Sequence, residues 1–136
     1  MPERLTEFPD RRVWDLTGFT LSQICLHYQV TLLLCELGSS ITVIIGNTFT
    51  LRVGERLDQM DPEQAMTLGP ILPLLHGSVA TLTAFRSGQL LLSFDGGAEI
   101  EVPKDDQYES WQTFGDGELA EAGMLCSPHT GSPWGG

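Results

Sequence analysis

The segment from Leu90 to Val102, LLLSF-DGG-AEIEV, allows few ways of folding. A three-residue loop at 95–97 brings the apolar residues of two strands together on one face: Leu90, Leu92, Phe94, Ala98, Ile100 and Val102. Successive residues of a strand point to opposite faces, so Glu99 and Glu101 share the other face. A two-residue loop would instead put both glutamates among the leucines. The pattern therefore predicts a hairpin with one apolar face.

The turn before this hairpin is Ser87-Gly88. We expect a two-residue hairpin turn there, because Gly takes the positive φ that such turns need. That register sets Phe85 opposite Leu90. Together with a last strand that contains Trp111, these segments predict a meander over residues 78–114.

A second meander is predicted over residues 19–53, where runs rich in β-branched residues and leucine alternate with turn residues. Three-residue loops at 38–40 and 46–48 place its apolar residues on one face. A shift of 57 residues superposes the two meanders and sets Leu33 on Leu90 and Val43 on Ile100. This match has two alternative explanations: an ancestral duplication, or simply the similarity of any two meanders of this kind.

Residues 61–75 join the two meanders and predict a short helix. Asp61 can cap it, Pro62 suits the first helical position and Gln64 completes a capping box. We expect residues 1–12 to be a flexible tail and residues 122–136 to hold a closing strand and a second tail. The fold class is mainly β (α+β), in a single domain: two antiparallel β-meanders pack as a sandwich or rolled sheet, with one short helix between them.

The net charge of −11, from 7 basic and 18 acidic residues, disfavours nucleic acid as a partner. No apolar run approaches the roughly 18 residues of a membrane span, and the first residues lack the apolar core of a signal peptide. Three cysteines, an odd number, fit a reducing compartment better than a disulfide framework. We therefore expect a cytoplasmic protein with no membrane or nucleic-acid partner.

Few residues suggest catalysis or metal binding. The three histidines, at 27, 76 and 129, do not have the spacing of a metal-binding helix, and the sequence has no CxxC. Cys126 and His129 are close in sequence, but nothing specifies the orienting group and oxyanion site that a nucleophile needs. We expect no cofactor, no metal and no enzymatic activity.

Acidic residues concentrate between Asp95 and Glu121, a segment that contains nine acidic residues and one basic residue, Lys104. The tetrad Tyr108-Glu109-Ser110-Trp111 lies within this segment, and strand alternation puts its two rings on opposite faces. An acidic strand face with one exposed aromatic is typical of a protein-binding surface, and also of a solvated sheet edge. The candidate partner-binding residues are Glu99, Glu101, Asp105, Asp106, Tyr108, Glu109 and Trp111.

Around this tetrad the chain resembles a family of small, functionally uncharacterised bacterial proteins, found mostly in actinobacteria. The shared features are an Asp-Gly hairpin, a Tyr-Glu-Ala-Trp strand and a closing Cys-x-Pro-Gly-Gly segment. They match LLLSFDGGAEIEVP, the tetrad with Ser110 in place of Ala, and Met124–Pro128, although the chain closes differently as HTGSPWGG. Some such proteins resemble immunity proteins for polymorphic toxins, so the resemblance implies a toxin-neutralising role. It transfers no catalytic residue.

Three functions are consistent with the sequence. The first is a non-catalytic protein-binding protein, most concretely an immunity protein that covers a partner's basic surface with its acidic face. The second is a small-molecule binder or small enzyme with a site between the sheets, with His27 or Tyr28 at its mouth. The third is a structural or assembly subunit that buries its exposed aromatic residues in a larger complex.

Overall fold

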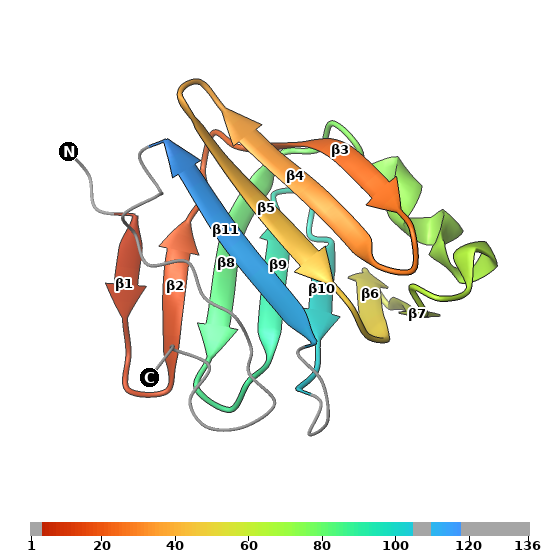
Figure 1. The fold of residues 1–136 in the computed structure, drawn as a ribbon. Coiled ribbons are helices and arrows are strands. Elements are labelled where there is room, and N and C mark those ends of the chain that lie inside the picture. Colours follow the sequence, from red (N-terminus) through yellow and green to blue (C-terminus); the bar gives the residue numbers. More distant parts are fainter. Residues whose placement is uncertain (1–3, 105–109, 118–136) are drawn as a thin grey trace.

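The fold is known from a computed structural model, which describes residues 4–104 and 110–117. Within these ranges the chain forms eleven strands and one 3-10 helix (Figure 1). The first seven strands are β1 (Leu5–Glu7), β2 (Arg11–Asp15), β3 (Thr20–Leu26), β4 (Val30–Glu36), β5 (Ser39–Ile45), β6 (Phe49–Val53) and β7 (Arg56–Met60). They are followed by η1 (Ala65–Leu74), β8 (Val79–Phe85), β9 (Leu90–Phe94), β10 (Glu99–Val102) and β11 (Trp111–Gly117).

The strands form two antiparallel sheets that pack face to face. The larger sheet has seven strands in the order β1-β2-β8-β9-β10-β6-β7, and the smaller has four in the order β11-β5-β4-β3. In Figure 1 the four-stranded sheet lies in front of the larger one. The mainly β class with two antiparallel sheets is thus confirmed.

The two predicted meanders exchange their fourth strands, which the sequence did not indicate. β6 leaves the first three strands of its own half and pairs with β10, where Ile100 faces Leu51. β11 reciprocally pairs with β5, where Trp111 faces Ile45. Because β4 and β11 occupy both sides of β5, no edge of β5 is left for β6.

The hairpin of β9 and β10 has the predicted register. Leu92 faces Ile100 and Leu90 faces Val102, across a loop at 95–97. The turn between β8 and β9 is a correction, because it holds three residues, 86–88, so that Ala84 rather than Phe85 faces Leu90. Gly88, at φ +108°, ends that loop in the left-handed conformation that three-residue hairpin loops favour.

The turn between β4 and β5 is a second correction. Glu36 pairs with Ser39, so the loop holds only Leu37 and Gly38 instead of residues 38–40. Gly38, at φ +87°, supplies the positive φ that a tight turn requires at this position. Leu32 and Leu34 therefore face the core and Leu33 faces outward, so the 57-residue shift that aligns β5 with β10 does not align β4 with β9.

The connector at 61–75 forms a 3-10 helix rather than a capped α-helix. Pro70 and Pro73 lie inside η1, and each removes a backbone donor that an α-helix would use. Asp61 makes a turn before the helix, where its carboxylate accepts a 3.0 Å hydrogen bond from the N–H of Glu63. Leu68 and Ile71 are buried, and η1 contacts β3 and β7, which are edge strands of the two sheets.

The N-terminal residues are also a correction. Residues 5–7 and 11–15 form strands β1 and β2, which extend the larger sheet beyond β8, so this part of the chain is not a flexible tail. Residues 122–136, predicted to hold a closing strand and a tail, lie outside the described residues.

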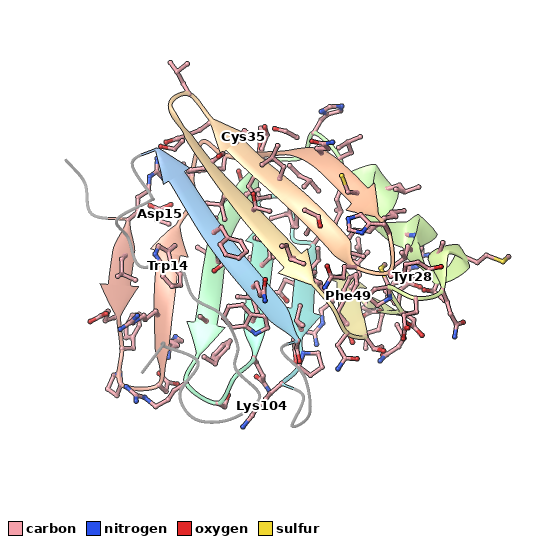
Figure 2. All side chains as sticks on the ribbon, in the orientation of Figure 1. Trp14, Asp15, Tyr28, Cys35, Phe49 and Lys104 are labelled. Carbon is pink, nitrogen blue, oxygen red and sulfur yellow. The ribbon has the colours of Figure 1, made fainter. Side chains whose placement is uncertain are left out.

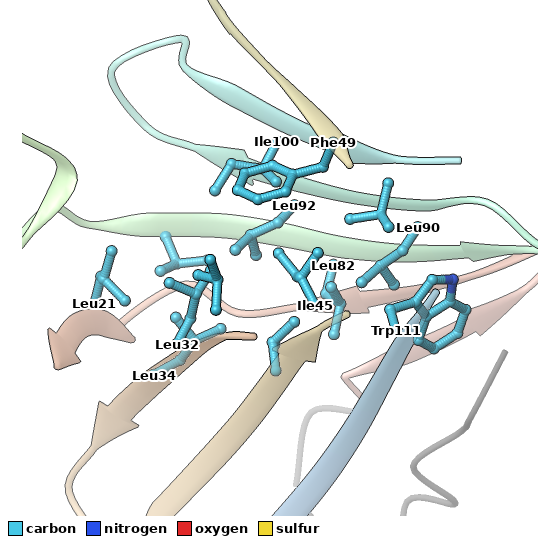
Figure 3. Packing of buried hydrophobic residues seen from close by; sticks show 14 of the residues in the cluster. Leu21, Leu32, Leu34, Ile45, Phe49, Leu82, Leu90, Leu92, Ile100 and Trp111 are labelled. Atoms are coloured by element: carbon cyan, nitrogen blue, oxygen red, sulfur yellow. The ribbon is translucent and has the colours of Figure 1, made fainter. Parts of the chain in front are cut away.

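The core lies between the two sheets and draws on both halves of the chain. Figure 3 shows Leu32 and Ile45 from the four-stranded sheet facing Leu82 and Leu92 from the larger sheet. Two large aromatic residues, Phe49 and Trp111, are fully buried at the start of the exchanged strands β6 and β11. The exchange therefore places one large ring from each half in the shared core.

Candidate functional site

The predicted partner-binding residues that the structure describes do not form one surface. Glu99 and Glu101 point outward from β10, as predicted, and Glu99 lies 3.9 Å from the guanidinium of Arg52. Asp105, Asp106, Tyr108 and Glu109 lie outside the described residues. The acidic segment is therefore represented here mainly by two glutamates on the outer face of the larger sheet.

Trp111 is not a surface anchor. Its side chain is 1% exposed, and its indole N–H donates a 2.9 Å hydrogen bond to the carbonyl oxygen of Gly88. A buried ring cannot serve as the exposed aromatic that a binding surface needs, so this candidate residue is corrected to a core residue.

The outer face of the larger sheet carries charges of both signs. Strand alternation places Arg11 and Asp15 on this face at one side of the sheet, and Arg52, Glu99 and Glu101 at the other. Among the described side chains this face is therefore mixed in charge rather than strongly acidic.

A different surface stands out around η1. A 3-10 helix has three residues per turn, so positions three apart lie on one side. Leu68, Ile71 and Leu74 form the inner side, while Met66, Leu72 and Leu75 form an outer stripe in which Met66 is 99% exposed. No residue from Ala65 to Leu75 carries a charge.

Tyr28 adds an aromatic ring near this end of the molecule. It lies in the tight turn between β3 and β4, has a φ of 56° and is 80% exposed. A left-handed conformation is uncommon for a bulky residue and costs free energy. Figure 2 labels Tyr28 at the end of the sandwich that η1 covers.

These residues belong to a larger group, which we call the η1 patch. Six of the ten large, exposed hydrophobic side chains in the described part of the chain lie on η1 and its C-cap, on β3 and its turn, or at the end of β6: Leu26, Tyr28, Val53, Met66, Leu72 and Leu75. η1 contacts both β3 and β7, so these elements adjoin one another. The predicted short helix over 61–75 did not indicate this patch, although the three-residue period of its apolar run was an available signal that both of its sides are apolar.

A polar cluster lies elsewhere, around Arg4. Its guanidinium contacts the Glu36 carboxylate at 2.8 Å and donates to the carbonyl oxygens of Asp15 and Thr17. The hydroxyl and the N–H of Thr17 donate to the Asp15 carboxylate at 2.7 and 2.9 Å. Those bonds, together with the charge of Arg4, hold the pKa of Asp15 below its usual value. The cluster ties the start of β1 to the end of β4 in the other sheet.

The described residues hold neither a cluster of metal-ligating side chains nor a membrane-spanning helix. They contain no group of three or more His, Cys, Asp or Glu side chains that could hold a metal ion. No helix among them is long and apolar enough to cross a membrane.

The comparisons with known proteins identify a family. The model of a family of unknown function, DUF6188, matches residues 13–132, which is most of the chain. The chain belongs to DUF6188. The match to DUF6188 begins within β2 and continues beyond the end of β11, so it includes η1 and all the strands from β3 to β11, but not β1. No curated protein and no solved structure matches the chain.

Proposed function

We propose that this DUF6188 protein is a non-catalytic protein-binding protein that uses the η1 patch as its contact surface. The observation that carries the proposal is the gathering of exposed apolar side chains around an uncharged helix. Apolar surface exposed in this way is characteristic of interaction sites. Tyr28 supports it, because an exposed aromatic ring is a frequent source of binding energy.

The partner proposed for this surface is a protein with a basic rim around an apolar centre. The chain has a net charge of −11, and four acids and two arginines occur between residues 52 and 63, beside the patch. Complementary charge accelerates encounter, whereas apolar contacts at the centre slow dissociation. Glu99 and Glu101 would contribute to this attraction from β10.

The finer proposal is that the chain is a toxin-neutralising immunity protein in a bacterial cytoplasm. It is supported by the resemblance seen in the sequence and by the strong negative charge, which suits an inhibitor that covers a basic active site. In this role the protein would block access to its partner without chemistry of its own.

The proposal is tested with three immobilised proteins and a lysate of the native host. The first is the wild type, the second carries Tyr28→Asp with Met66→Asp, and the third carries Leu37→Asp. Leu37 is 102% exposed in the turn between β4 and β5, outside the patch, so it controls for adding a charge at an exposed apolar site. We expect one partner to bind the wild type and the control but not the patch variant.

The affinity for the captured protein is then measured with purified components. Truncating a central aromatic anchor costs about 2 kcal/mol or more, roughly 30-fold in Kd, so Tyr28→Ala should weaken binding by at least that factor. Equal capture by all three proteins would refute the η1 patch as the contact surface. A captured partner without a basic surface would refute the acidic-inhibitor proposal while leaving the patch intact.

A further inference from the structure

The outer side of η1 lacks one side chain. Positions three apart in a 3-10 helix lie on one side, so Met66, Gly69 and Leu72 form a column that continues at Leu75. Met66 and Leu72 are 99% and 50% exposed, and Gly69 is exposed between them. At a rise of about 2.0 Å per residue, the backbones of Met66 and Leu72 lie roughly 12 Å apart. The η1 patch therefore has a notch at Gly69, with an apolar side chain on either side.

The local backbone does not require glycine at this position. Gly69 is not one of the glycines with a positive φ. A Cβ placed on Gly69 meets no heavy atom within 4 Å beyond its chain neighbours and the backbone of its own helix, so packing does not exclude a side chain. Glycine inside a helix is less stable than alanine, because it loses more backbone freedom on folding. Gly69 thus has a cost in stability that no contact within the fold offsets.

The following proline does not explain Gly69 either. A Cβ on the residue before a proline approaches the proline ring and disfavours a helical conformation. Leu72 precedes Pro73 in the same helix and carries such a Cβ. Since η1 accommodates a side chain before one proline, Pro70 does not by itself demand glycine at position 69.

The chemistry of the notch favours an apolar occupant. Its walls are the side chains of Met66 and Leu72, and no residue from 65 to 75 carries a charge. A charged group placed there would lose water without gaining an ion pair. The gap of one side chain fits a leucine, isoleucine, methionine or phenylalanine from another protein, and side chains that fill such depressions carry much of the energy of an interface.

We propose that the notch at Gly69 receives one bulky apolar side chain of the protein partner, and so determines which partners the η1 patch accepts. This role of Gly69 rests on the proposed function, because it requires a protein bound at the η1 patch. It adds the chemistry of the partner's anchor residue and a specificity-determining position to that function.

The test starts from random peptides of about 12 residues displayed on phage. The library is selected on the wild type and depleted on the variant with Tyr28→Asp and Met66→Asp, so that peptides that need the η1 patch remain. We expect the enriched peptides to share one leucine, isoleucine, methionine or phenylalanine. A synthetic peptide of the enriched sequence is then the probe in calorimetric titration.

Gly69→Leu fills the notch, and Gly96→Leu is the matched control. Gly96 also lacks a positive φ, is exposed and meets nothing within 4 Å, but it lies in the loop between β9 and β10. Overpacking an apolar contact should weaken peptide binding about tenfold or more for Gly69→Leu, against less than about twofold for Gly96→Leu. Both variants should unfold within about 3 °C of the wild type, because neither leucine is crowded by a neighbour.

A double-mutant cycle identifies the side chain that occupies the notch. Replacing the shared apolar residue of the peptide by alanine should weaken binding to the wild type about tenfold or more. The same replacement should have a much smaller effect on binding to Gly69→Leu, because the anchor is already excluded there. Such coupling would not arise if the leucine at position 69 only disturbed η1.

Four outcomes would overturn the proposal. Equal binding of the peptide by Gly69→Leu and the wild type would remove the notch while leaving the η1 patch as a contact surface. Additive effects in the cycle would place the anchor elsewhere. A fall in the thermal midpoint of Gly69→Leu that accompanies the loss of binding would assign the glycine to the fold. Failure to enrich any peptide that needs the patch would also count against the notch, whereas the proposed function is decided separately by capture of a host protein.

Discussion

The indole of Trp111 donates a 2.9 Å hydrogen bond to the carbonyl oxygen of Gly88. This bond joins the first residue of β11, in the four-stranded sheet, to the loop between β8 and β9 in the larger sheet. The two residues are 23 positions apart, and the bond is buried. It fixes where the exchanged strand β11 begins.

Substitutions of Trp111 should therefore reduce stability. Trp111→Phe loses the hydrogen bond, which is worth about 0.5–1.5 kcal/mol, and Trp111→Ala also leaves a cavity, for a total of about 3–5 kcal/mol. Urea unfolding followed by circular dichroism measures both. The control Leu37→Ala, at an exposed turn, should change the free energy of unfolding by less than about 0.5 kcal/mol. A loss of less than 1 kcal/mol for Trp111→Ala would contradict the burial of the ring.

Gly88 should tolerate a side chain less well than Gly38. Both have positive φ, at +108° and +87°, so alanine is strained at each. A Cβ at Gly88 would lie 2.8 Å from the side chain of Lys104, whereas a Cβ at Gly38 meets nothing within 4 Å. We expect Gly38→Ala to cost about 1 kcal/mol, from backbone strain alone, and Gly88→Ala to cost clearly more. Equal thermal midpoints for the two variants would contradict this packing.

Asp15 should contribute stability that depends on pH. Its pKa in the folded protein is lowered by the hydrogen bonds from Thr17 and the charge of Arg4. A lowered pKa gives stability that is present above the unfolded value, about 3.9, and is lost as the pH falls through the folded value. Asp15→Asn should therefore be less stable than the wild type at pH 7, by a small amount because the group is largely exposed. The two proteins should converge once the pH falls below the folded pKa of Asp15, and a constant difference across the acidic range would contradict the assignment.

Tyr28→Gly should separate stability from binding. Glycine relieves the left-handed strain, worth about 1–2 kcal/mol, but loses about 0.5–1 kcal/mol to backbone entropy, so the variant should be slightly more stable than the wild type. It should nevertheless bind the captured partner at least as weakly as Tyr28→Ala. Thermal unfolding and calorimetric titration provide the two values. A marked loss of stability would mean that the ring packs against the fold.

The charges on β10 should act mainly on the association rate. Glu99→Lys with Glu101→Lys should slow association with the captured partner and flatten its salt dependence, because it removes a charge attraction that salt screens over a Debye length of about 8 Å. A matched variant, Glu7→Lys with Asp10→Lys, makes the same change in net charge at β1 and its turn, and should have a smaller effect. Equal rates at low salt for the β10 variant and the wild type would show that these glutamates only promote solubility.

Local pattern was sufficient for part of the fold. The alternation of leucines and glutamates in β9 and β10 determined the 95–97 loop, the pairing of Leu92 with Ile100 and the outward direction of Glu99 and Glu101. The mainly β class and a helical connector also followed from the sequence. These features depend on neighbours within about ten residues, where strand period and turn chemistry decide the outcome.

Long-range relationships were decided only by the tertiary structure. Alternation gives a strand two faces, but it does not say which sheet the strand joins, so the exchange of β6 and β11 could not be read from either half alone. The apolar periodicity of η1 likewise does not say that Met66 lies outside while Leu68 lies inside. Trp111 has the same side-chain chemistry whether it is exposed or buried, and only the tertiary structure, in which its indole bonds to Gly88 in the loop between β8 and β9, shows that it is buried. In each case the deciding contact joins segments that are far apart in sequence, and such a contact cannot be predicted from local propensity.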